Sequence, residues 1–331
     1  MRGDRGLRAR KREETRPVFR LTPSLSALAV ALALAAPVAA ADPDTCSDIA
    51  FADVGWTDIT ATTALARTVL DGLGYTTSVD LLALPVTFQS LERGDIDVFL
   101  GNWMPTMESD IAPYREKGTI DTVRTNLVGA KYTLATLKPL ADEGLTDFAR
   151  IAEFKDRLGG KIYGIEPGND GNRLILDMIA QDKFGLGGFE LVESSEQGML
   201  AQAKRAARQE EGIVFLGWEP HPMNANLEMV YLTGGDDVFG ANFGGAEVRT
   251  LTRAGLVGEC PNLGKLLQNM EFTLPMENEV MGKILDDGDA PEDAAAEWLK
   301  ANPAALDPWL AGVTSRDGGD GMAAVRTALG L

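Results

Sequence analysis

Three tryptophans stand beside glycines at the predicted ends of hydrophobic strands. The stretch VFLGNWMP contains Trp103, IVFLGWEP contains Trp218, and DVGWTD contains Trp56. In open α/β sheets, ligands bind beyond the carboxyl ends of the strands. We therefore expect the three indoles to converge on one cleft, with the glycines letting backbone or ligand come close. For any single tryptophan, a place in the hydrophobic core is the alternative.

The chemistry suited to a group of indoles is the binding of cations. An aromatic face attracts a cation, and a desolvated contact contributes about 2 kcal/mol or more. A quaternary ammonium group fits several rings best, because it is cationic but has no N–H donor with which to pair a carboxylate. Trp298 and Trp309 lack the glycine-flanked strand context, and we expect them to pack between helices.

The elements that must position these residues alternate along the chain. Helical apolar spacing with glycine stops predicts helices at 61–74, 87–95, 171–185 and 196–212. Apolar runs predict strands at 49–55, 78–85, 96–101, 131–137, 161–168, 189–194, 213–217 and 246–256. Such alternation predicts an α/β protein with mainly parallel sheets, built as two successive series of strands and helices.

The N-terminus has the pattern of a secretory signal peptide. A basic region precedes an apolar run at 25–36, which is too short to span a bilayer comfortably, and small residues offer cleavage after Ala40 or Ala41. An uncleaved anchor is the alternative. The full chain has a net charge of −18, and the first forty residues carry eight basic against three acidic residues, so removing them leaves −23. We expect an exported protein that is repelled by nucleic acid.

Two cysteines remain after cleavage, Cys46 and Cys260. An even count in an exported chain predicts one disulfide, and two buried thiols are the alternative. The chain has a single histidine, His221, and no cysteine pair at ligand spacing, so we expect no metal site and no cofactor. With no serine or cysteine partner in the sequence for His221, we expect it to be structural rather than catalytic.

Several long motifs closely resemble the choline-binding periplasmic proteins of ABC importers, within the wider glycine betaine/choline/carnitine substrate-binding family. The motifs are DVGWTDITATT, DVFLGNWMPTME, GAKYTLA, GIEPGNDGNR, ESSEQGMLAQ, VFLGWEPHPMN and GLVGECPNLGKLLQNM. The resemblance implies a two-lobed, hinged α/β periplasmic binding protein of type II, with the ligand cleft between the lobes. It also implies the pairing of Cys46 with Cys260. The implied division is a cleaved signal peptide at 1–41, first-lobe segments at 42–125 and 231–331, and a second lobe at 126–230.

The resemblance also implies a set of ligand-binding residues. Trp56 and Trp103 from the first lobe would form an aromatic box with Tyr132 and Trp218 from the second. At the hydroxyl end of the ligand it places two further residues, Asp58 and Asn169.

Each of the residues beyond the tryptophans also has a structural alternative. Tyr132 reads as a strand tyrosine packing at the hinge, Asp58 as a helix N-cap, and Asn169 as a cap or turn residue. An ionised Asp58 would favour choline over glycine betaine, which carries a carboxylate.

These features predict a monomeric periplasmic receptor that captures choline and hands it to an ABC permease with its ATPase. Receptors for glycine betaine, carnitine or acetylcholine are alternatives within the same class. An exported enzyme acting on a quaternary amine, with Asp58 or His221 as base, is the alternative from another class, and we expect no enzyme.

Overall fold

A computed structural model describes residues 41–331 of the chain, and the predicted signal peptide lies outside this range except for Ala41. Nine strands form one sheet in the order β2-β1-β3-β9-β4-β7-β5-β6, with β8 paired to β4. The strands are β1 (Asp48–Asp53), β2 (Thr76–Leu81), β3 (Val98–Met104), β4 (Ile120–Leu137), β5 (Lys161–Tyr163), β6 (Glu190–Val192), β7 (Val214–Glu219), β8 (Met229–Tyr231) and β9 (Gly245–Arg253).

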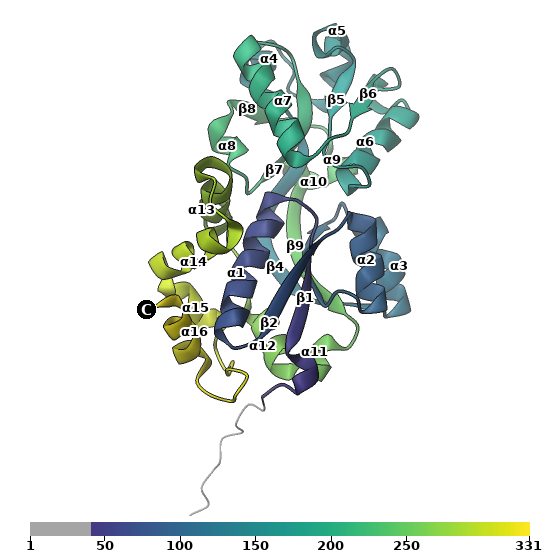
Figure 1. Ribbon diagram of the computed structural model, residues 1–331. Coiled ribbons are helices and arrows are strands. Elements are labelled where there is room, and N and C mark those ends of the chain that lie inside the picture. Colours follow the sequence, from purple (N-terminus) through teal and green to yellow (C-terminus); the bar gives the residue numbers. More distant parts are fainter. Residues whose placement is uncertain (1–40) are drawn as a thin grey trace, which may run out of the picture. The chain divides into compact units, whose positions relative to one another are not determined.

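The sheet is mixed, so the prediction of mainly parallel sheets was wrong in part. β1 pairs in parallel with β2 and β3, and β5 pairs in parallel with β6 and β7. The two long strands β4 and β9 run antiparallel to each other, and they join the two parallel groups through antiparallel pairs with β7 and β3. Figure 1 shows β4 and β9 lying side by side between the two groups. Local apolar patterns predict single strands but not this long-range pairing.

Along the chain, α-helices connect successive strands, and further helices follow the last strand. They are α1 (Thr57–Gly72), α2 (Leu84–Arg93), α3 (Glu108–Lys117), α4 (Lys138–Asp142), α5 (Lys155–Leu158), α6 (Asp170–Ala180), α7 (Glu196–Gln209), α8 (Met223–Asn226), α9 (Asp236–Phe239), α10 (Ala241–Gly244), α11 (Leu256–Glu259), α12 (Pro261–Asn269), α13 (Leu274–Gly282), α14 (Pro291–Ala301), α15 (Leu306–Trp309) and α16 (Gly321–Leu329). The predicted helices at 61–74, 87–95, 171–185 and 196–212 correspond to α1, α2, α6 and α7. The sequence patterns did not predict α3 or β8.

The first helix is packed on several sides. α1 packs against β1 and β3 on one side and against α13, α14 and α16 on the other. Its apolar residues are buried on nearly every turn, among them Ala61, Leu65 and Val69. A helix held on several sides keeps its N-terminal turn in a fixed place, and that turn carries residues of the site described below.

A disulfide joins Cys46, at the start of the described chain, to Cys260, at the start of α12. This confirms the predicted bridge, and it excludes the alternative of two buried thiols. The bridge ties the segment before β1 to the C-terminal helices across a sequence separation of 214 residues. Among residues 41–331, no helix is both long enough and apolar enough to cross a membrane.

Candidate functional site

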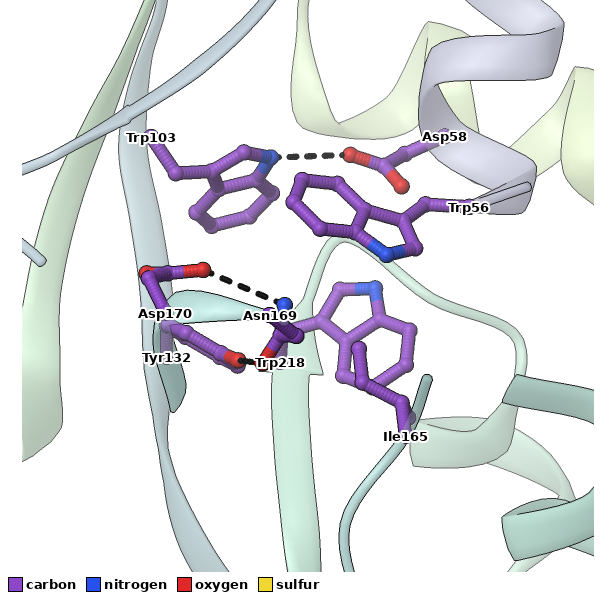
Figure 2. Close-up of a pocket in the computed structure, with 8 residues that line it drawn as sticks. All are labelled: Trp56, Asp58, Trp103, Tyr132, Ile165, Asn169, Asp170 and Trp218. Atoms are coloured by element: carbon purple, nitrogen blue, oxygen red, sulfur yellow. Dashed lines mark hydrogen bonds between the residues drawn. The ribbon is translucent and has the colours of Figure 1, made fainter. Parts of the chain in front are cut away.

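A cavity of about 260 Å³ brings the predicted aromatic residues together. Figure 2 shows the lining side chains directed toward one another. They are Trp56, Asp58, Trp103, Tyr132, Ile165, Asn169, Asp170 and Trp218.

The three predicted tryptophans reach the cavity from different elements. Trp56 is the residue that precedes the first turn of α1, whereas Trp103 and Trp218 lie within β3 and β7 rather than beyond them. The expectation that both strands end at their glycines was therefore wrong. The strands continue because a partner strand pairs with their last residues: Val248 of β9 is opposite Trp103, and Tyr132 of β4 is opposite Trp218.

The glycines before two of these indoles serve internal packing, not the approach of a ligand. A Cβ on Gly101 would stand 2.8 Å from the side chain of Ile59 in α1. A Cβ on Gly217 would stand 3.0 Å from Met229 and 3.1 Å from Ala135. Each glycine thus lets a neighbouring element pack closely against the strand that carries the indole.

Tyr132 lies between two of the indoles. Its ring centroid is 5.9 Å from that of Trp103 and 6.4 Å from that of Trp218, with the second pair edge to face. Gly171 in the first turn of α6 leaves the room for the phenol, since a Cβ there would stand 2.7 Å from Cζ of Tyr132. Tyr132 is 5 % exposed, and it packs against its neighbours while also lining the cavity.

Asp58 lies in the first turn of α1 and is 1 % exposed. One carboxylate oxygen, Oδ2, accepts a hydrogen bond of 3.1 Å from Nε1 of Trp103, and the other, Oδ1, has no hydrogen-bond partner. Burial, together with the nearby carboxylate of Glu196, raises the pKa of Asp58 to about 8. The alternative that Asp58 is an N-cap was wrong, because the cap position is Trp56 and no side chain of this segment caps the helix.

Asn169 is the N-cap of α6, as the alternative for this residue proposed, and it also lines the cavity. Its Oδ1 accepts hydrogen bonds of 3.0 Å from both the Tyr132 hydroxyl and the backbone N–H of Asn172. One hydrogen of its Nδ2 is donated to Asp170 at 3.1 Å. The amide therefore fixes the phenol of Tyr132 and retains a second N–H.

Three residues around the cavity were not predicted from the sequence. Ile165 and Asp170 line it, and Glu166 accepts a 2.7 Å hydrogen bond from Nε1 of Trp56. Burial raises the pKa of Glu166 to about 7 and that of Asp170 to about 6. Ile165 and Glu166 belong to the quoted motif GIEPGNDGNR, as Asp170 does, but nothing in the motif alone shows which of its residues turn inward.

Apart from Ile165 and Asn169, the lining residues are aromatic or acidic, and none is a lysine, arginine or histidine. Burial raises the pKa values of Asp58 and Asp170, and no cationic side chain lines the cavity to offset this effect. A permanent cation placed among them would offset this missing charge. Within residues 41–331, no three His, Cys, Asp or Glu side chains are arranged to hold a metal ion.

The remaining tryptophans pack elsewhere, as predicted. Trp298 in α14 donates to Glu279 at 2.6 Å, and Trp309 in α15 donates to the carbonyl of Glu271 at 3.1 Å. Neither residue lines the cavity.

Comparisons with known proteins identify the family. The OpuAC family, the substrate binding domain of ABC-type glycine betaine transport systems, matches residues 47–301. The chain is 65 % identical to an ABC-transporter choline binding protein solved in complex with choline, over 87 % of this chain and 100 % of that one, with a TM-score of 0.86. The unliganded, semi-closed form of an ABC-transporter choline binding protein gives the same identity and coverage, with a TM-score of 0.81.

The fold is shared more widely than the sequence. Lactococcal OpuAC, solved in a closed form with glycine betaine, is 24 % identical over 80 % of this chain and 99 % of its own, with a TM-score of 0.72. The predicted fold class, the α/β fold of periplasmic binding proteins, is confirmed. The family is one of extracytoplasmic binding proteins rather than enzymes. The chain belongs to the OpuAC family of substrate-binding proteins of ABC transport systems.

Proposed function

We propose that this protein binds choline in the cavity of about 260 Å³ and delivers it to an ABC permease. The observation that carries the proposal is the meeting of four aromatic rings and a buried carboxylate with an unpartnered oxygen around one cavity: Trp56, Trp103, Tyr132, Trp218 and Asp58. The 65 % identity to a protein solved with choline supports the choice of ligand.

The rings hold the trimethylammonium group of choline. A quaternary ammonium carries its charge under methyl groups and offers no N–H, so ring faces give it both dispersion and cation–π attraction. The indole N–H groups of Trp56 and Trp103 are already donated to Glu166 and Asp58. The bond between Trp103 and Asp58 lies within the first lobe and fixes that ring before the ligand arrives, so little freedom is lost on binding. The bond between Trp56 and Glu166 joins the two lobes and forms as they close.

The polar side chains bind the hydroxyl end and select against carboxylates. Asp58 offers its unpartnered Oδ1 as an acceptor, and Asn169 offers the second N–H of its amide. A bound trimethylammonium group favours the ionised form of Asp58, and glycine betaine would then place its own carboxylate beside the charges of Asp58 and Asp170, where like charges repel. Choline, with a hydroxyl in that place, avoids this cost, and we expect it to bind more tightly than glycine betaine.

The two lobes close around the ligand before the protein docks on the permease. The first lobe comprises 42–125 and 231–331, and the second comprises 126–230. In support of this division, β4 and β9 are the long strands that join the two parallel groups. Lining residues come from both lobes, so a ligand that contacts both lobes favours the closed form. The closed monomer, exported to the periplasm by the signal peptide at 1–41, docks on the permease, and a separate ATPase powers uptake.

Calorimetric titration of the mature protein tests the proposal, after unfolding and refolding to remove any co-purified ligand. The titrants are choline, glycine betaine and acetylcholine. We expect binding of choline at one site, with glycine betaine much weaker. Glycine betaine binding as tightly as choline would overturn the role of Asp58. No measurable binding of any of the three titrants to a folded protein would overturn the choice of ligand.

A further inference from the structure

Glu196 is a fully buried carboxylate that does not line the cavity. It is the first residue of α7 and is 0 % exposed. Its Oε2 accepts a 2.9 Å hydrogen bond from the backbone N–H of Thr57, and its Oε1 accepts another from the hydroxyl of the same residue. The ring of His221 lies 3.3 Å from the same Oε1. All the polar contacts of this carboxylate therefore lie on other elements.

The contact with Thr57 supplies what α1 lacks. The first N–H groups of a helix have no partner within the helix, and a side chain just before it commonly accepts one of them. The residue at that position in α1 is Trp56, which has no side-chain acceptor, and Glu196 takes the role from the opposite segment of the chain. A carboxylate in this place also interacts favourably with the helix dipole.

His221 extends the contacts of Glu196 to the segment that carries Trp218. The backbone N–H of Met223 donates to Nδ1 of His221 at 2.9 Å, so in the neutral ring Nε2 carries the hydrogen and donates to Glu196. The His221 ring also packs against Trp218, with ring centroids 4.9 Å apart. One carboxylate thus joins the segment that carries Trp218 to the turn that carries Trp56 and Asp58.

We infer that Glu196 is a positioning residue that latches the two lobes together in the ligand-bound state. The inference rests on the proposed function, since it assigns Thr57 to the first lobe and Glu196 to the second. The latch brings a second carboxylate near Asp58, whose pKa it helps to raise. That proximity is unfavourable while the cavity is empty, and a bound cation offsets it. The latch therefore forms most readily around a cationic ligand.

The test compares Glu196→Ala, Glu196→Gln and Thr57→Val with the wild-type protein. Calorimetry gives the Kd for choline, stopped-flow tryptophan fluorescence gives the dissociation rate, and thermal melts are recorded with and without choline. We expect Glu196→Ala to weaken binding roughly tenfold or more, mainly through faster dissociation. Glu196→Gln keeps an acceptor oxygen and Thr57→Val keeps the backbone N–H, so both should lose less.

A structural role alone would lower the melting temperature of the choline-free protein, whereas the latch should leave it unchanged and reduce only the stabilisation that choline adds. The matched control is Glu211→Gln. Glu211 is an exposed carboxylate just after α7, and this variant should behave as wild type. The inference is overturned if Glu196→Ala keeps the wild-type Kd and dissociation rate, or if the choline-free melt falls as much as the bound one. If Glu196→Ala does not fold, the Kd, dissociation rate and melting temperature of Glu196→Gln and Thr57→Val are compared with wild type by the same criteria. Wild-type protein that does not bind choline would instead overturn the proposed function.

Discussion

The charge of Asp58 should make choline binding depend on pH. With a pKa of about 8 in the empty cavity, only about one Asp58 in a hundred is ionised at pH 6. A bound trimethylammonium group favours the ionised carboxylate and lowers this pKa. Because the raised pKa keeps the free form neutral at low pH, affinity should fall as pH drops below 8. The expected loss approaches tenfold per pH unit, or roughly fiftyfold between pH 8 and pH 6.

Calorimetry measures both the affinity and the proton that binding releases. Choline has no titratable group, so any pH dependence belongs to the protein. Titrations at pH 7 in phosphate and in Tris, which differ in ionisation enthalpy, should report the release of close to one proton per choline bound. Titrations from pH 6 to pH 8 should trace the fall in affinity.

Two variants assign the effect to one carboxyl group. Asp58→Asn should bind choline more weakly at pH 8 and lose most of the pH dependence. Glu166→Gln removes a neighbouring carboxyl, with a pKa of about 7, but should keep the steep dependence that Asp58 causes. A wild-type Kd that stays constant within about twofold from pH 6 to pH 8, with no proton released, would refute the reasoning.

Five further substitutions test the site and its support. Trp103→Ala and Trp218→Ala should each weaken choline binding well over tenfold without unfolding the protein, while Trp298→Phe should lower the melting temperature and leave the Kd unchanged; near-native affinity in both alanine variants defeats the cage. Gly171→Ala should displace the Tyr132 ring and raise the Kd in calorimetry, and an unchanged Kd would count against a role for that ring. Cys46→Ser should lower the free energy of unfolding in urea by about 4–5 kcal/mol, since the bridge closes a long loop, and a change in Kd as well would contradict its purely structural role.

The tryptophans of the site were predictable because their local context repeats. Glycine beside an indole near the end of an apolar strand occurs at Trp56, Trp103 and Trp218, and all three line the cavity. The reason first given for the glycines was wrong, since Gly101 and Gly217 make room for neighbouring side chains. A local pattern thus located the residues without revealing the packing that requires it.

The rest of the site depends on contacts that no local pattern contains. Tyr132 looks like any strand tyrosine, and only the family resemblance marked it as a site residue. It faces the cavity because β4 pairs with β7 in a register that places it opposite Trp218. Glu166 contacts Trp56, and Glu196 contacts Thr57 in the first turn of α1, each from a distant part of the chain. Sequence separation of more than a hundred residues hides such contacts from any reading of motifs.

The structure of the choline complex tests the central claim most directly. The cage account predicts the quaternary nitrogen within about 6 Å of the ring centroids of Trp56, Trp103, Tyr132 and Trp218. It also predicts the choline hydroxyl within hydrogen-bonding distance of Asp58 or Asn169. Choline bound at another place on the protein, with these rings left around an empty cavity, would contradict the account.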